Sequence, residues 1–140
     1  GQLVISGAKA ALERAMALAK ERGAKRAIPL AVSIAAHSPL MAEAAAEFRR
    51  VLDATPFQKP GIPIVANATA GPLIEPDDIR EALGRQLTSP VRWTESVRWM
   101  IAQGVTQFIE VGPKDVLTGL VKRIDGTVKV ATTEESLARS

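Results

Sequence analysis

Short apolar runs typical of β-strands alternate with amphipathic helical segments along nearly the whole chain of 140 residues. The apolar runs predict strands over residues 2–6, 25–33, 62–67, 106–111 and 127–131. The segments between them predict helices over residues 8–22, 38–53, 77–87, 89–103 and 115–124. Such alternation is typical of an α/β fold with mostly parallel strands, because each helix carries the chain back across the sheet.

The composition removes several classes of function. The chain has no cysteine and one histidine, so disulfides, thiolate chemistry and the usual zinc ligand sets are excluded, and a reducing, cytoplasmic setting is favoured. No apolar run approaches the roughly 18 residues that predict a membrane-spanning helix. The densest basic stretch, residues 20–26, has no aromatic neighbour for stacking on nucleic acid. With a net charge of +3, this stretch indicates either an acidic partner or a solvated helix end.

The single histidine, His37, stands between an apolar run and the start of a helix. Ser38 is a favourable N-cap, and Pro39 suits the first helical position because its missing N–H has no partner there. His37 is therefore expected at the carboxyl end of a strand, which is where ligands bind in open α/β sheets. The nearby helix N-terminus favours the neutral ring, which can accept a proton. A hydrogen-bonded structural histidine is the alternative.

A nucleophile to match this histidine is missing from the sequence. The chain contains no G-x-S-x-G elbow, no P-loop and no G-x-G-x-x-G motif. Ser33 and Ser38 are the serines nearest to His37, and Ser38 is better explained as a helix cap. If His37 is a general base, its nucleophile therefore lies elsewhere.

Six segments carry a recognisable family pattern in order: GQLVISG at 1–7, GAKRAIPLAVS at 23–33, AAHSPLM at 35–41, IPIVANATA at 62–70, IREALGRQLTSPVRWTESVRWM at 79–100 and GVTQFIEVGPKDVLTGLVKRI at 104–124. Together they resemble the C-terminal half of malonyl-CoA:acyl carrier protein transacylases and of the related acyltransferase domains of polyketide and fatty acid synthases. The resemblance covers nearly the whole chain, which makes it far more specific than a lone histidine.

The resemblance implies a fold in two parts. It implies an α/β-hydrolase-like core with an inserted ferredoxin-like subdomain. Residues 1–33 would be the second half of that subdomain, and residues 34–140 would be the C-terminal part of the acyltransferase core.

The resemblance also implies site residues. In the family a serine in a G-H-S-x-G elbow is acylated, and the family histidine corresponds to His37. The backbone carbonyl that orients the histidine ring maps to Gln86. The family needs no metal and no organic cofactor, since the coenzyme A thioester is a substrate. The serine elbow, the oxyanion-hole segment and the arginine that binds the malonate carboxylate have no match in this sequence. Ile34, three residues before the histidine, matches neither polyketide pattern (HAFH or YASH), which favours the standalone fatty acid enzyme.

The implied function is transfer of a malonyl group from coenzyme A to the phosphopantetheine thiol of acyl carrier protein in fatty acid biosynthesis. The expected partners are malonyl-CoA, the carrier protein and an N-terminal half with the nucleophilic serine, without which the chain is expected to be inactive. Because carriers of this family are acidic, Lys25 and Arg26 are candidates for carrier docking, with a solvated strand start as the alternative. Two other functions stay open: a polyketide synthase acyltransferase domain with another extender unit, and a non-catalytic carrier-binding fragment.

Overall fold

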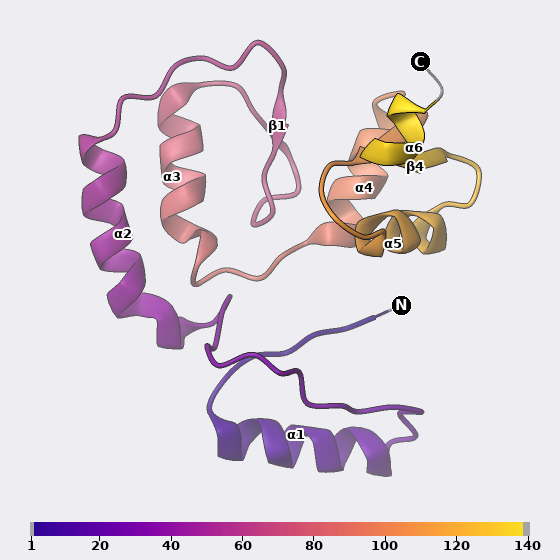
Figure 1. Cartoon of the computed structure of the whole chain (residues 1–140). Helices are drawn as coiled ribbons and strands as arrows, with labels where there is room; N and C mark the ends of the chain where they lie inside the picture. The colour runs from indigo at the N-terminus through magenta and orange to yellow at the C-terminus, as the bar shows by residue number, and fades with distance from the viewer. Residues whose placement is uncertain (1, 139–140) are drawn as a thin grey trace. The chain divides into compact units, whose positions relative to one another are not determined.

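The computed structural model describes residues 2–138, which form two compact units. The His37 unit consists of residues 2–64 and 73–91, and the β3–β4 unit consists of residues 65–72 and 92–138. Each unit is a mixture of helices and extended segments (Figure 1), so the expectation of a mixed α/β chain is confirmed.

The His37 unit contains three α-helices and one short 3-10 turn: α1 (Lys9–Glu21), η1 (Pro39–Met41), α2 (Ala42–Ala54) and α3 (Pro76–Gln86). α2 and α3 pack side by side (Figure 1), with Leu52 of α2 buried beside Gly84 of α3. The strands β1 (Ile64–Val65) and β2 (Pro72–Leu73) form a small two-stranded sheet. The helices over residues 8–22, 38–53 and 77–87 are thus confirmed to within about two residues at each end, the ordinary uncertainty of helix boundaries.

Two expected strands of this unit do not form. Residues 2–6 and 25–33 are irregular, so His37 does not follow a strand. A strand needs a neighbour for its backbone hydrogen bonds, and within the described residues neither segment has one. Pro29 lacks an N–H, and the Val32 N–H turns back to the Leu30 carbonyl at 2.8 Å. The apolar side chains of these segments are consequently exposed: Leu3, Val4, Ile5, Ile28, Leu30 and Val32.

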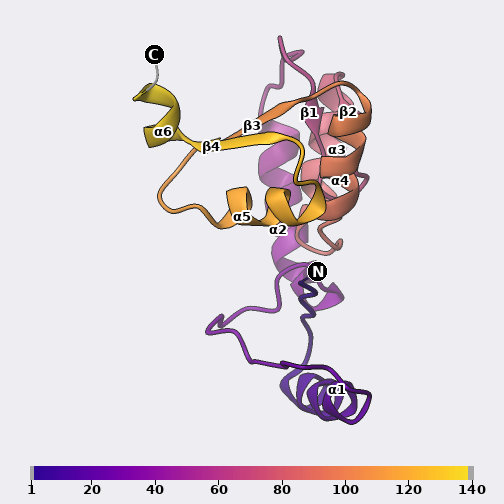
Figure 2. The same ribbon diagram turned by 90° about the vertical axis from the view of Figure 1, so that its right-hand side faces the viewer.

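In the β3–β4 unit, β3 (Gln107–Glu110) pairs in parallel with β4 (Lys129–Thr132), with Phe108 opposite Val130. α5 (Val116–Ile124) connects the two strands, which run side by side in Figure 2. The expected strands over residues 106–111 and 127–131 and their parallel direction are confirmed. α5 also packs against α4 (Trp93–Ala102), where Val97 is fully buried. α4 begins three residues after Pro90, later than the Ser89-Pro90 start that we expected.

Helix caps account for the other differences in this unit. Asp115, directly before α5, makes no capping hydrogen bond with its side chain. Directly after β4 the chain forms a short helix, α6 (Thr133–Leu137). Thr132 and Glu135 form a reciprocal capping box at its start. The pattern Thr-x-x-Glu is the sequence signal for a capping box. No apolar run follows it here, so the sequence alone does not predict the helix.

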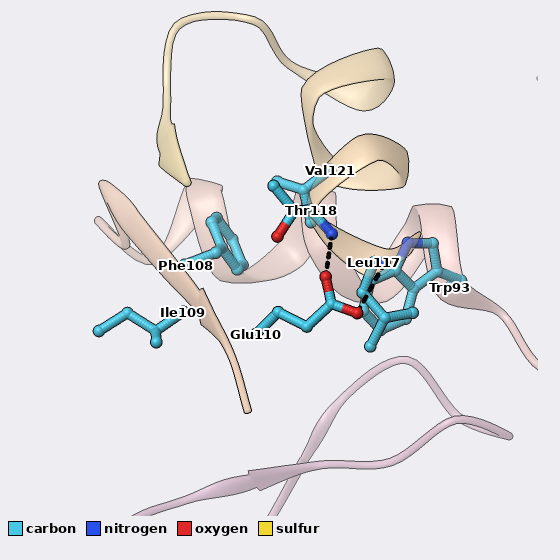
Figure 3. A pocket seen from close by; sticks show the side chains of 7 residues that line it. All are labelled: Trp93, Phe108, Ile109, Glu110, Leu117, Thr118 and Val121. Atoms are coloured by element: carbon cyan, nitrogen blue, oxygen red, sulfur yellow. Dashed lines mark hydrogen bonds between the residues drawn. The ribbon is translucent and has the colours of Figure 1, made fainter. Parts of the chain in front are cut away.

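Glu110, the last residue of β3, replaces Asp115 as the cap of α5 (Figure 3). Its carboxylate accepts the Thr118 N–H at 2.7 Å and the Leu117 N–H at 3.0 Å. The Thr118 N–H, more than the Leu117 N–H, holds the pKa of the Glu110 carboxyl group below its ordinary value. The same residue's backbone carbonyl accepts the Thr133 hydroxyl at 3.0 Å, so Glu110 joins β3 to both neighbouring helices.

We expect Glu110→Gln to lower the stability of the protein at neutral pH and to flatten its loss of stability in acid. Because the pKa of Glu110 is lower in the folded than in the unfolded state, its contribution is complete above the unfolded value of about 4.3. That contribution disappears as the pH falls through the folded value. Urea unfolding midpoints between pH 3 and pH 7 should therefore differ most near pH 7 and converge in acid. Glu47→Gln is the control, since Glu47 is exposed and pairs with no other side chain in the described part of the chain; an equal effect there would contradict the prediction.

Candidate active site

His37 lies in a tight turn between residues 35 and 38, directly before η1. Its backbone φ is 61°, in the left-handed region that few residues other than glycine adopt. The turn is fixed on one side by Ser38, which is only 5% exposed. The Ser38 hydroxyl donates to the Ala35 carbonyl at 2.7 Å and accepts the Leu40 N–H at 3.3 Å, which makes it the helix cap that we expected.

The His37 ring contacts the end of α3. Nδ1 of His37 lies 3.0 Å from the backbone oxygen of Gln86, which is 49 residues further along the chain. Because a carbonyl oxygen only accepts hydrogen bonds, Nδ1 carries the hydrogen in this contact. In the neutral ring Nε2 is then unprotonated and can accept a proton. This is the pair of atoms that the family resemblance brings together.

Gln86 is suited to this contact by its place in the helix. It is the last residue of α3, and the last carbonyls of an α-helix have no partner within the helix. The partial negative charge at a helix C-terminus also favours a donor such as an imidazole N–H. The Gln86 side chain takes no part in the contact, so the geometry depends on where α3 ends.

The packing of α3 on α2 sets the distance between the two site residues. Gly84 allows the helices to approach, since a Cβ atom there would lie 3.2 Å from Nη1 and 3.5 Å from Cδ of Arg49. The Arg49 guanidinium donates to Glu81 at 2.7 Å and to Asp53 at 2.8 Å. The hydrogen bond from Arg49 lowers the pKa of Glu81. These ion pairs are exposed and contribute little stability, so burial of Leu52, which lies beside Gly84, contributes more to the packing.

Arg80 adds a second contact between the helices at their far end. Its Nε donates to the Leu52 carbonyl at 3.3 Å, and its guanidinium lies 5.0 Å from the centre of the Phe57 ring. This contact ties α3 to the C-terminal turn of α2 and to the loop that follows. Together with the Arg49–Glu81 pair, this contact holds α3 against the C-terminal half of α2.

The other expected site residues, Lys25 and Arg26, lie in the irregular segment of the His37 unit. Both are exposed, and neither forms an ion pair within the described part of the chain. No serine hydroxyl hydrogen-bonds to the His37 ring among residues 2–138. Ser6, which the sequence did not single out, donates its hydroxyl hydrogen to the Ala36 carbonyl at 2.5 Å.

The residues that the structure describes contain no cluster of three or more histidine, cysteine, aspartate or glutamate side chains able to bind a metal ion. Nor do they contain a helix both long and apolar enough to cross a membrane.

Comparison with known proteins identifies relatives of one kind. No family model matches the chain. The malonyl CoA-acyl carrier protein transacylase of Bacillus subtilis (strain 168) is 50% identical over 129 residues, which are 92% of this chain and 41% of that protein. The corresponding protein of Escherichia coli (strain K12) is 48% identical over 138 residues, which are 99% of this chain and 45% of that protein.

Solved structures show the same likeness. An acyl carrier protein S-malonyltransferase from Vibrio cholerae is 47% identical and superimposes with a TM-score of 0.91, over 96% of this chain and 45% of that one. A malonyl-transacylase solved in complex with its type II PKS acyl-carrier protein is 46% identical, with a TM-score of 0.89 over 92% of this chain and 42% of that one. The chain spans less than half the length of these relatives. Over nearly all of its own length, the chain is therefore similar to one part of the malonyl CoA-acyl carrier protein transacylases.

Proposed function

We propose that this chain is the part of a malonyl-CoA:acyl carrier protein transacylase that supplies the general base, His37, and the carbonyl that orients it, Gln86. The observation that carries the proposal is the 3.0 Å contact between Nδ1 of His37 and the Gln86 oxygen. This contact leaves Nε2 as the proton acceptor. The proposed enzyme works in the cytoplasm, in fatty acid biosynthesis.

The proposed reaction has two halves, and His37 moves a proton in each. In the first half Nε2 takes the proton of the serine hydroxyl while the serine oxygen attacks the thioester carbonyl of malonyl-CoA. The C–S bond breaks, and the coenzyme A thiolate leaves with the proton from the imidazolium. In the second half Nε2 takes the proton of the carrier's phosphopantetheine thiol. The thiolate attacks the malonyl-serine ester, and the serine oxygen leaves and regains the proton. Coenzyme A enters as a substrate, so the scheme uses no separate cofactor.

The contact between the His37 ring and the Gln86 carbonyl at the end of α3 suits both halves of the reaction. A main-chain acceptor on Nδ1 fixes the tautomer without placing a full negative charge beside the ring. The partial negative charge at the end of α3 stabilises the positive charge that the ring gains when it takes a proton. The acidic third member of a catalytic triad is thereby replaced by a helix end.

The serine and the rest of the core come, in this proposal, from an N-terminal half. Residues 1–33 then belong to a ferredoxin-like subdomain and residues 34–140 to an α/β-hydrolase-like core. The parallel strands support this, because parallel sheets normally have both faces covered. Among the described residues β3 pairs only with β4. Ile109 on β3 is 48% exposed and Val111 just after it is 84% exposed, so further polypeptide would cover them.

The proposed carrier docks through Lys25 and Arg26. Two observations support this assignment. Both side chains are exposed and form no ion pair within the described residues, and both lie on the same unit as His37. Residues 9–26 hold six basic and two acidic side chains, a surplus of four positive charges that exceeds the net charge of +3 for the whole chain. A surface of this kind attracts an acidic partner.

The proposal is tested by a transfer assay on the complete protein. Radiolabelled malonyl-CoA and a holo-carrier protein should yield labelled carrier, with a labelled serine on the enzyme when the carrier is omitted. The 140-residue chain alone should give neither product, and both should return when an N-terminal half bearing the serine is added. Assays with fatty acid and polyketide carriers, and with other acyl-CoA extenders, separate the two enzyme functions. Absence of labelled carrier and of labelled serine from the complete protein would leave a non-catalytic carrier-binding role.

We expect Gln86→Ala to reduce acylation far less than loss of His37, by no more than a few-fold. Alanine keeps the backbone carbonyl and favours the helix, so the acceptor for Nδ1 stays in place. Single-turnover acylation of the complete enzyme measures the effect. A loss as large as that of His37→Ala would mean that the Gln86 side chain acts directly.

A further inference from the structure

Ser6 fixes the peptide group that precedes His37. Its hydroxyl donates to the Ala36 carbonyl at 2.5 Å, across 30 residues of sequence. Within the described part of the chain, no other hydrogen bond joins residues 2–6 to the rest. A serine just before a helix usually caps it. Here α1 begins after Ala8 without a side-chain cap, so the Ser6 hydroxyl serves the distant turn in place of its own helix.

The Ala36 carbonyl controls the backbone of His37. The carbonyl of Ala36 and the N–H of His37 belong to one planar peptide group. The φ angle of His37 is the rotation that relates this plane to the rest of the residue. Holding the carbonyl oxygen therefore restricts φ, which at 61° is in the left-handed region that is uncommon for residues other than glycine. Strained backbone of this kind persists where its surroundings hold it.

His37 is thus held from three directions. Ser38 holds the Ala35 carbonyl at 2.7 Å, and the Gln86 carbonyl lies 3.0 Å from the ring. The Ser38 contact is local, and the Gln86 contact acts on the ring. Among the residues that the structure describes, only the Ser6 contact connects a distant segment to the peptide next to His37.

We propose that Ser6 is a positioning residue of the acyl-transfer site, which holds the left-handed backbone of His37 so that the ring faces the Gln86 carbonyl and the acyl-transfer centre together. This inference rests on the proposed function of His37. Ser6 acts through the Ala36 peptide, and its hydroxyl is engaged there.

The test is single-turnover acylation of the complete enzyme at saturating malonyl-CoA. Ser6→Ala should slow acylation about three- to tenfold, the effect of losing one hydrogen bond. The KM for malonyl-CoA and the urea midpoint should stay near those of the wild type, since Ser6 is exposed and its hydroxyl makes a single hydrogen bond within the described residues. Ser6→Thr keeps the hydroxyl and should acylate within about twofold of the wild type, since an intact hydrogen bond leaves only small changes. Ser33→Ala is the matched control, because Ser33 is an exposed serine near His37 that forms no hydrogen bond within residues 2–138.

Three results would overturn the positioning role: equal rates for Ser6→Ala and Ser33→Ala, failure of Ser6→Thr to restore the rate, or a fall in the urea midpoint that accounts for the loss. His37→Ala, assayed in parallel, separates this inference from the proposed function. If His37→Ala is slow and Ser6→Ala is not, only the role of Ser6 is wrong. If His37→Ala acylates normally, the proposed function fails, and the role of Ser6 fails with it.

Discussion

Replacement of His37 by alanine in the complete enzyme is expected to slow acylation of the serine by about 10²–10⁴-fold, the usual contribution of a general base. The contact between Nδ1 and the Gln86 oxygen leaves Nε2 as the atom that takes the serine proton. Without it the hydroxyl has to lose its proton to water, and the thioester meets a much weaker nucleophile.

The measurement is rapid-quench acylation with radiolabelled malonyl-CoA in a single turnover. Alanine at a φ of 61° adds backbone strain to the loss of the ring, which complicates a single variant. His37→Asn provides the control, because asparagine tolerates the left-handed region and cannot act as a base. Both variants should lose acylation alike, while only His37→Ala should also lose stability in urea. Near-normal acylation by either variant would remove His37 from the proposed role.

The helices that frame this site could be predicted because their signals are local. Ser38 and Pro39 mark the start of η1, and the apolar spacing along α2 and α3 marks the faces that meet. The pairing of His37 with Gln86 followed from the family motifs alone. Nothing in the local sequence indicates that residues 49 positions apart touch.

The strands were predicted less well because a strand depends on its neighbours. β3 and β4 form because α5 carries the chain back, so that β4 lies beside β3. Residues 2–6 and 25–33 have equally apolar patterns and lack a partner among the described residues, so they are irregular.

The contacts of Ser6 and Glu110 could not be predicted for a related reason. Each side chain bonds to backbone groups brought close only by the tertiary fold, at separations of 30 residues for Ser6 and seven or eight for Glu110. Local rules place a serine or an aspartate beside the helix it caps. In α5 a glutamate on the preceding strand takes the N–H groups, and Asp115 beside the helix does not.

Reversal of the two basic residues proposed for carrier docking, Lys25→Glu with Arg26→Glu, should raise the apparent KM for the carrier about tenfold or more at low salt. Charges at the edge of an interface act mainly on the association rate, which electrostatic steering changes by roughly 10–10³-fold. Serine acylation by malonyl-CoA, measured without the carrier, should be unchanged, because neither side chain takes part in the His37 contacts.

Two controls show whether the increase in the carrier KM depends on Lys25 and Arg26 in particular. One is its salt dependence, and the other is reversal of a second pair of basic residues. The screening length falls from about 10 Å at 0.1 M salt to about 3 Å at 1 M, so the increase in KM should shrink steeply over that range. Lys122 and Arg123, near the end of α5, are adjacent and exposed, and reversing them changes the net charge by the same amount. If carrier docking uses Lys25 and Arg26 specifically, reversal of Lys122 and Arg123 should raise the carrier KM much less, because steering depends on the charges that face the partner. Equal increases from both pairs would mean that the carrier senses only the total charge. An unchanged KM after reversal of Lys25 and Arg26 at low salt would place the docking surface elsewhere.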